Sequence, residues 1–127
     1  MTIMVVDDSR IMRNAVKGFF SGMNIPCSYV EAADGEEALS LLESDSIDLV
    51  LLDWNMPKLS GIDFLKAVRA NSKYKTLPII MVTSESAKFS VIEALKNGAT
   101  DYVTKPINPE LFKEKIGRLP LFKEIGI

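Results

Sequence analysis

The sequence predicts an α/β fold in which five strand–helix units form one doubly wound parallel sheet. Short, almost wholly apolar runs recur along the chain, as they do in parallel strands buried on both faces. Each run is followed by a segment whose apolar residues recur at helical spacing, which is the connection that parallel strands require. With 127 residues, 47% hydrophobic and 25% charged, the chain suits one domain over residues 1–127 with a packed core.

The first unit begins with an apolar strand over residues 3–6, which ends at the carboxylates Asp7 and Asp8. Ser9 or Asp8 is suited to cap the following helix, because both side chains accept backbone N–H groups. The apolar residues of this helix recur at helical spacing, and they are Ile11, Ala15, Phe19 and Met23, with Met12, Val16 and Phe20 beside them. Residues 24–26 (Asn-Ile-Pro) end the helix.

A more polar strand is predicted over residues 28–32, at an edge of the sheet, and residues 34–35 (Asp-Gly) form a turn after it. The helix that follows the turn carries the apolar residues Ala38, Leu41 and Leu42. The third strand, residues 49–52, is wholly apolar and therefore belongs at the centre of the sheet. It ends at Asp53, because Pro57 excludes a regular continuation.

The third helix begins near Ser60, where Ser60 and Asp63 resemble a capping box with Asp in place of Glu. Its buried stripe consists of Phe64, Leu65 and Val68. A loop over residues 74–78 leads to the fourth apolar strand, residues 79–82, which ends at Thr83. The next helix presents one apolar face, formed by Val91, Ala94 and Leu95.

Residues 97–98 (Asn-Gly) suit the end of that helix, and a short fifth strand over residues 101–104 ends at Lys105 and Pro106. Residues 108–109 (Asn-Pro) provide an N-cap with proline at the first helical position. The stripe of the last helix consists of Leu111, Phe112 and Ile116. We expect Gly117 and Pro120 to stop this helix early and to leave residues 121–127 as a short apolar tail.

Five polar side chains stand at strand ends: Asp7, Asp8, Asp53, Thr83 and Lys105. The flavodoxin-like strand order 2-1-3-4-5 places its switch point between the first and third strands, at the sheet edge where ligands bind. Clustered carboxylates repel one another unless a cation intervenes, and Mg²⁺ prefers such oxygen ligands. A carboxylate beside that ion can attack a phosphoryl group to form an acyl phosphate, which a lysine and a hydroxyl can stabilise.

These strand-end residues, with Pro106 after Lys105, match the full signature of response-regulator receiver domains, and the chain resembles that family over nearly its whole length. The resemblance implies that Asp53 is the phosphoacceptor and Lys105 the phosphate-contacting lysine, within a cis Lys-Pro peptide. It also implies Mg²⁺ ligation by Asp8, Asp53 and the backbone carbonyl of Asn55, with Asp7 assisting through water.

Within the family, the chain is most similar to the single-domain chemotaxis regulators, in its residues 4–8, 53–57, 81–83, 102–103 and 105–106. The resemblance implies that Thr83 and Tyr102 form the switch and that Asn55 and Glu85 tune the phosphate lifetime. It implies a partner-binding face that includes Lys88, Val91, Tyr102 and Lys115. The break at Gly117 and Pro120 departs from these regulators and affects that face, not the phosphorylation site.

The resemblance therefore implies a signalling protein that catalyses only its own phosphorylation and dephosphorylation. A histidine kinase donates the phosphoryl group, a phosphatase is a further partner, and the target is the flagellar motor switch or another protein, contacted without an attached output domain. The alternative is a relay intermediate that passes phosphate to a histidine phosphotransfer domain. A magnesium phosphatase of the haloacid-dehalogenase type is disfavoured, because Asn55 stands where that class needs an acidic residue.

The amino-acid composition excludes several other classes of protein function. The chain has no histidine, so it carries neither a phosphohistidine nor a Ser-His-Asp triad. Its 15 basic and 17 acidic residues lack the basic excess of a nucleic-acid-binding surface. Its single cysteine, Cys27, permits no internal disulfide. We expect no membrane segment and a cytoplasmic location.

Overall fold

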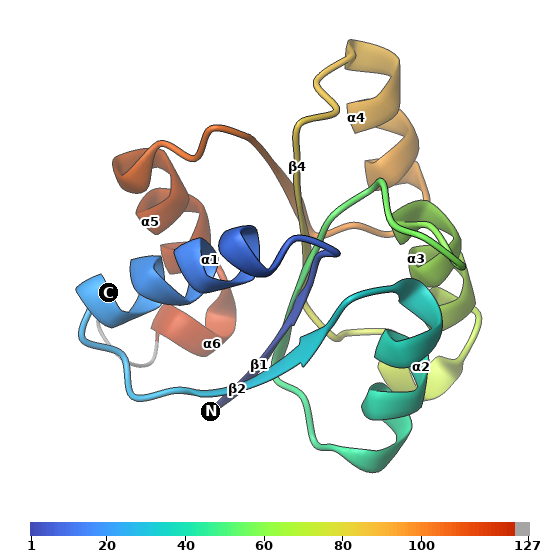
Figure 1. The fold of residues 1–127 in the computed structure, drawn as a ribbon, viewed down its shortest axis with the longest axis horizontal. Coiled ribbons are helices and arrows are strands. Elements are labelled where there is room, and N and C mark those ends of the chain that lie inside the picture. The colour runs from blue at the N-terminus through green and yellow to red at the C-terminus, as the bar shows by residue number, and fades with distance from the viewer. Residues whose placement is uncertain (124–127) are drawn as a thin grey trace.

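The computed structural model describes residues 1–123 and shows a central sheet between two layers of helices (Figure 1). The strands are β1 (Thr2–Val6), β2 (Ser28–Ala32), β3 (Leu49–Leu52), β4 (Ile79–Thr83) and β5 (Asp101–Thr104). The helices are α1 (Arg10–Gly22), α2 (Gly35–Ser44), α3 (Gly61–Arg69), a 3-10 turn η1 (Ser72–Tyr74), α4 (Lys88–Lys96), α5 (Pro109–Gly117) and α6 (Pro120–Lys123).

The sheet has five parallel strands in the order β2-β1-β3-β4-β5, which confirms the predicted doubly wound, flavodoxin-like fold. The register pairs Val6 of β1 with Leu52 of β3. The next residues, Asp7 and Asp53, therefore leave the sheet at the same level and on adjacent strands. This register brings the two carboxylates together at the predicted switch point.

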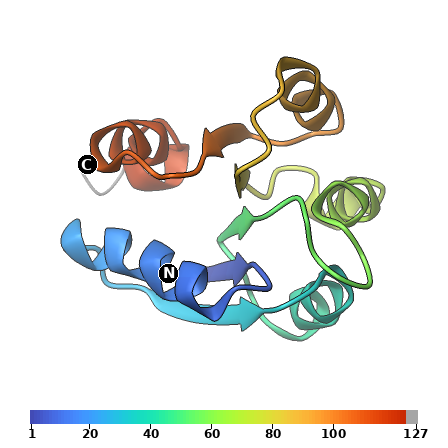
Figure 2. The same cartoon turned by 45° about the horizontal axis from the view of Figure 1, so that its top comes forward.

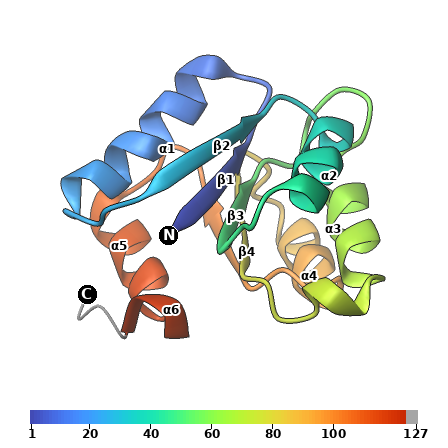
Figure 3. The same cartoon turned by 90° about the horizontal axis from the view of Figure 1, so that it is seen from below.

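Each face of the sheet has its own core. The cores differ in the helices that cover them: α2, α3 and α4 lie on one side, and α1, α5 and α6 on the other (Figures 2 and 3). All four residues of β3 and all five of β4 are buried. The continuous apolar runs in the sequence are thus explained by strands that face helices on both sides.

The predicted N-caps are present. Ser9 accepts the Met12 N–H at 3.3 Å, and Asn108 accepts the Leu111 N–H at 3.1 Å. The capping box at the start of α3 differs from the prediction: Ser60 caps the Asp63 N–H, but its hydroxyl then donates to the Asp63 carboxylate at 3.1 Å. In a full capping box the acidic side chain would accept the N–H of the capping residue. Here the shorter aspartate accepts the Ser60 hydroxyl instead.

Three large apolar residues assigned to helix stripes are exposed instead: Ile11 (81%), Leu95 (46%) and Leu111 (45%), and the smaller Ala15 is exposed as well. In α1 the inward face is formed by Val16 and Phe20. Ile11 precedes Phe20 by nine residues, which places it about half a turn away, on the opposite face of a helix with 3.6 residues per turn.

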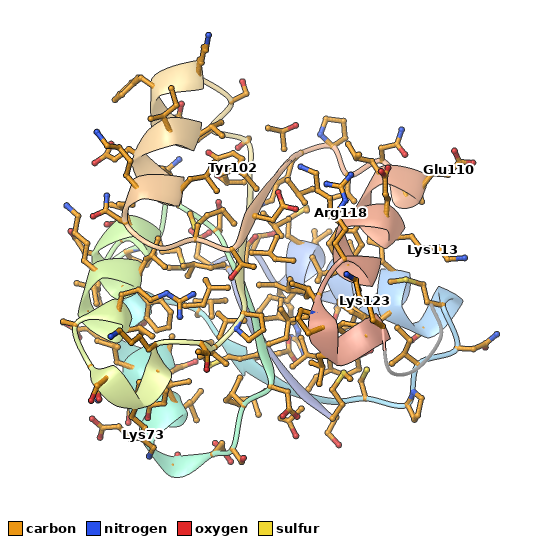
Figure 4. The ribbon with its side chains drawn as sticks, turned by 180° about the vertical axis from the view of Figure 1, so that it is seen from behind. Lys73, Tyr102, Glu110, Lys113, Arg118 and Lys123 are labelled. Atoms are coloured by element: carbon orange, nitrogen blue, oxygen red, sulfur yellow. The ribbon has the colours of Figure 1, made fainter. Side chains whose placement is uncertain are left out.

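The predicted tail is wrong where the structure describes it. Helix α5 ends at Gly117 as expected, but Pro120 begins α6, because proline is compatible with the first position of a helix. Phe122 in α6 is fully buried, with its ring 6.2 Å from that of Phe20. Figure 4 shows α6 with Lys123 at its end, below α5. Residues 124–127 lie outside the described part of the chain.

The predicted loop over residues 74–78 overlaps η1 by one residue, Tyr74.

Cys27 is half-buried, and burial raises the pKa of its thiol. No helix in residues 1–123 combines the length and the apolar character needed to traverse a lipid bilayer.

Candidate functional site

Four of the five predicted strand-end residues meet at the carboxyl edge of the sheet. Asp7 follows β1, Asp53 follows β3 and Lys105 follows β5, and Asp8 lies within reach of both other carboxylates. Asp7 and Asp53 are buried, with 5% and 8% of their surface exposed, whereas Asp8 is exposed. The site is therefore an acidic cluster of two buried carboxylates and one exposed carboxylate.

Lys105 bridges the two buried carboxylates. Its Nζ donates to Asp7 Oδ2 at 2.8 Å and to Asp53 Oδ2 at 3.3 Å. Burial alone would lower the pKa of the Lys105 ammonium, but hydrogen bonds and attraction from Asp7 and Asp53 outweigh burial and raise that pKa above its usual value. Lys105 is thus a fixed positive charge between two negative ones. The Lys105–Pro106 peptide bond is cis, as the family resemblance implies.

The backbone around Asp53 is held from both sides. Its N–H donates to the Val6 carbonyl at 2.9 Å, and its Oδ1 accepts the Trp54 N–H at 2.7 Å. The Gly61 N–H donates to the Trp54 carbonyl at 2.8 Å, and Gly61 lies so close to the Asp53 carbonyl that a Cβ would overlap it. Only glycine fits at this close approach, which fixes the loop after β3.

The Asp7 side chain organises the start of α1. Its Oδ1 accepts the Ser9 N–H at 2.9 Å, while its Oδ2 pairs with Lys105. The Asp7 N–H donates to the Ala32 carbonyl on β2 at 3.0 Å. Asp7 therefore has a structural role at the start of α1, and the water-mediated metal contact that the family resemblance implies stays a prediction.

The residues fit a hard divalent cation. Carboxylate oxygens of Asp7, Asp8 and Asp53 lie within 4.8 Å of one another. Within residues 1–123 the carbonyl of Asn55 accepts no hydrogen bond, and this residue follows Asp53 by two positions in the exposed loop. An all-oxygen donor set with room for water is the kind of site that Mg²⁺ prefers.

The predicted switch residues, Thr83 and Tyr102, are linked by hydrogen bonds through the β4–α4 loop. Thr83 ends β4, the strand next to the one that Asp53 follows. Thr83 is fully buried, and its Oγ1 accepts the Glu85 N–H at 3.2 Å. The Tyr102 hydroxyl donates to the Glu85 carbonyl. Thr83 and Tyr102 thus hold the same residue of the β4–α4 loop. Within residues 1–123 Thr83 makes no direct bond to Asp53.

The Tyr102 ring points inward, where it is 95% buried and lies beside α4 (Figure 4). Burial, followed by the negative charges of Glu85 and Asp53, raises the pKa of Tyr102 to about 12. Its hydroxyl is therefore protonated at neutral pH and available as a donor. The Glu85 carboxylate bonds locally, accepting from the Ser90 hydroxyl at 3.3 Å.

The residues of the predicted partner face come from α4, β5 and α5. Lys88 is exposed at the start of α4, and Val91 is half-buried against the core that contains Tyr102. Lys115 on α5 is 20% exposed, because its ammonium lies 3.4 Å from Asp101 and donates to the Tyr102 carbonyl. Among residues 1–123 Lys88 forms no ion pair, while Lys115 is paired with Asp101.

Sequence reasoning missed Arg13. Its guanidinium Nη1 donates to the Asp7 carbonyl at 2.6 Å, and its Nε pairs with Glu31 at 3.0 Å. Nothing in the pattern of α1 separates Arg13 from an ordinary solvated arginine, because the bond runs to a backbone atom whose position depends on the tertiary fold.

The family model of the response regulator receiver domain matches residues 3–117. The chain is 41% identical to the chemotaxis protein CheY of Pseudomonas aeruginosa, covering 94% of this chain and 95% of that protein. It is 43% identical to CheY1 of Helicobacter pylori, over 91% and 94% of the two chains. The solved structure of Vibrio cholerae CheY4 is similar, with 36% identity, a TM-score of 0.81, and coverage of 92% and 96%.

Proposed function

The chain belongs to the response regulator receiver family, and from that premise we propose that Asp53 accepts a phosphoryl group from a histidine kinase. The observation that carries this proposal is the cluster of Asp7, Asp8 and Asp53 at the switch point of the sheet, where Lys105 pairs with Asp7 and Asp53. Residues 1–127 act as one receiver domain in the cytoplasm, and the protein signals through its phosphorylation state.

In the proposed reaction a carboxylate oxygen of Asp53 attacks the phosphorus of a phosphohistidine. A P–O bond forms, the P–N bond breaks, and its electron pair stays on the imidazole nitrogen, which takes a proton from solvent. Asp53 is suited to this step because its other oxygen is held by the Trp54 N–H. Lys105 is placed to exchange its bond with Asp53 for one with the phosphoryl oxygens.

Mg²⁺, when bound by Asp8, Asp53 and the Asn55 carbonyl, supplies positive charge that offsets the charge on the transferred group. Asp7 supports this site through water and through its bond to the Ser9 N–H. The carboxylates also require this neutralisation themselves, because Lys105 provides one positive charge for three of them.

Phosphorylation is proposed to reach the target through Thr83 and Tyr102. When the Thr83 hydroxyl turns to a phosphoryl oxygen, it releases the Glu85 N–H that it now holds. The β4–α4 loop, which Tyr102 also contacts, then adopts a second arrangement and changes the face that includes Lys88, Val91, Tyr102 and Lys115. Asn55 and Glu85, at the rim, set the access of water and so the phosphate lifetime.

The proposed target is the flagellar motor switch, because the matched relatives are chemotaxis proteins. This is tested by measuring binding to a motor-switch protein and to a histidine phosphotransfer domain, with and without acetyl phosphate and Mg²⁺. We expect phosphorylation to tighten motor binding at least about tenfold, a difference of roughly 1.4 kcal/mol, and Asp53→Asn to abolish the gain. Transfer of the phosphoryl group to the phosphotransfer domain, without motor binding, would establish the relay function instead.

A further inference from the structure

Arg13 links the second turn of α1 to the main chain of the acidic site. Its Nη1 donates to the Asp7 carbonyl at 2.6 Å, and its Nε donates to Glu31 Oε1 on β2 at 3.0 Å. The Arg13 side chain is only 15% exposed. The Arg13 guanidinium is therefore held in place. It contacts the backbone of the acidic cluster at Asp7, and its own carboxylate partner, Glu31, lies outside that cluster.

The carbonyl that Arg13 holds belongs to the peptide group between Asp7 and Asp8. The next peptide group, between Asp8 and Ser9, is held by its N–H, which donates to Asp7 Oδ1 at 2.9 Å. Both peptide groups that flank Asp8 are thus fixed, while the Asp8 residue itself is exposed. The direction in which the Asp8 side chain leaves the backbone depends on these two bonds.

We propose that Arg13 is a positioning residue for the cation site, which sets the placement of Asp8 and thereby the site's preference for Mg²⁺. This inference rests on the proposed function, since it takes Asp8 as a ligand. Arg13 does not touch the ion, and it acts only through the Asp7–Asp8 peptide group.

An arginine is required because the contact needs two donors in a fixed relation. One guanidinium nitrogen meets a carbonyl and another meets a carboxylate, which the planar fork of arginine achieves and a lysine ammonium does not. Glu31 also pairs with Lys17 at 3.0 Å. Hydrogen bonds from Lys17 and Arg13 lower the pKa of Glu31, so this carboxylate is ionised at neutral pH and holds Arg13 in place.

The loss of metal affinity that follows replacement of Arg13 should be larger for Mg²⁺ than for Ca²⁺. Mg²⁺ demands near-ideal octahedral geometry, whereas Ca²⁺ accepts flexible geometry and more ligands. Loss of a group that orients a ligand typically weakens metal binding by about 10-fold to 100-fold. For Arg13→Met we therefore expect about tenfold weaker Mg²⁺ binding and a loss of less than about threefold for Ca²⁺.

The test is a titration of each ion followed by the fluorescence of Trp54, the single tryptophan, which directly follows Asp53. Lys17→Met is the matched control, because Lys17 shares Glu31 but makes no bond to Asp7. Its Mg²⁺ affinity should stay within about twofold of the wild type, taken as the limit of an indirect effect. Urea unfolding of each variant shows that the titrated protein is folded.

The proposal is supported if Arg13→Met loses Mg²⁺ affinity selectively. Arg13→Lys and Glu31→Gln, which loosen the same link without removing all of it, should lie between Arg13→Met and the wild type, and they decide the matter if Arg13→Met does not fold. Equal losses for both ions, or wild-type affinity in all three variants, would overturn it. If wild-type protein itself binds no Mg²⁺, the proposed function fails, and the inference fails with it.

Discussion

Replacement of Lys105 by methionine tests the electrostatics of the site, because it removes the charge and keeps the length of the side chain. Lys105 pairs with Asp7 and Asp53, whose side chains are 7% and 10% exposed. Without Lys105 and without a metal ion, two buried carboxylates lose their shared cation. We expect Lys105→Met to lower the free energy of unfolding in the presence of a chelator.

The structure gives the size of this loss. With an effective dielectric constant of about 20, separations of 2.8 and 3.3 Å correspond to roughly 6 and 5 kcal/mol of attraction. The cost of burying the ammonium offsets much of this, and removing one member of a buried pair typically costs about 3–5 kcal/mol. Lys105 keeps 15% exposure, so we expect about 3 kcal/mol, at the lower end of that range.

Urea unfolding followed by Trp54 fluorescence measures the loss. Lys58→Met is the control, since Lys58 is 64% exposed and lies 3.8 Å from Asp34, and it should cost less than about 0.5 kcal/mol. Added Mg²⁺ should restore part of the Lys105→Met loss, about 1.4 kcal/mol if the variant binds the ion tenfold more tightly than the wild type. A loss no larger than that of Lys58→Met, or one that Mg²⁺ leaves unchanged, would refute the reasoning.

Three further predictions concern the fold and the loops around the site. Phe122→Ala should lower the free energy of unfolding by about 3–4 kcal/mol, measured by urea unfolding, because the ring is fully buried; a loss below about 1 kcal/mol would mean that α6 is only a surface tail. Gly61→Ala should destabilise the protein by about 1–3 kcal/mol and impair phosphorylation, because the new Cβ overlaps the Asp53 carbonyl. The control is Gly18→Ala, because a Cβ at this helical position meets no atom within 4 Å; it should raise the free energy of unfolding by about 0.5–1 kcal/mol. A larger loss of stability for Gly18→Ala than for Gly61→Ala would contradict this packing. Tyr102 has a folded-state pKa raised to about 12, so its contribution to stability is full below pH 10 and is lost as pH rises toward about 12. Wild type should therefore lose stability above pH 10 more steeply than Tyr102→Phe, and parallel losses would show that the tyrosine hydroxyl is not held.

The sheet order was predictable from the sequence because each strand is a short apolar run and each connection is a helix, which leaves few allowed topologies. The meeting of Asp7, Asp53 and Lys105 follows from the same topology, since parallel strands end at one edge. These features depend on pattern and connection rules, and both can be read without coordinates.

Features that depend on three-dimensional packing were not predictable. Ile11 fits a helical repeat in the sequence, but the face that meets the sheet is the one with Val16 and Phe20. Phe122 lies two positions after Pro120, and a proline is compatible both with the end of one helix and with the start of another. The burial of Phe122 against Phe20 favours the helix start. The bond from Arg13 ends on a backbone carbonyl, which carries no sequence signal.

The measurement that tests the central claim most directly is the intact mass of the protein after incubation with acetyl phosphate. Wild-type protein with Mg²⁺ should gain the mass of one phosphoryl group, and it should gain much less when a chelator removes the ion. Asp53→Asn should gain none under the same conditions. If the wild type gains no phosphoryl mass, or if Asp53→Asn gains as much as the wild type, Asp53 is not the acceptor and the account is wrong.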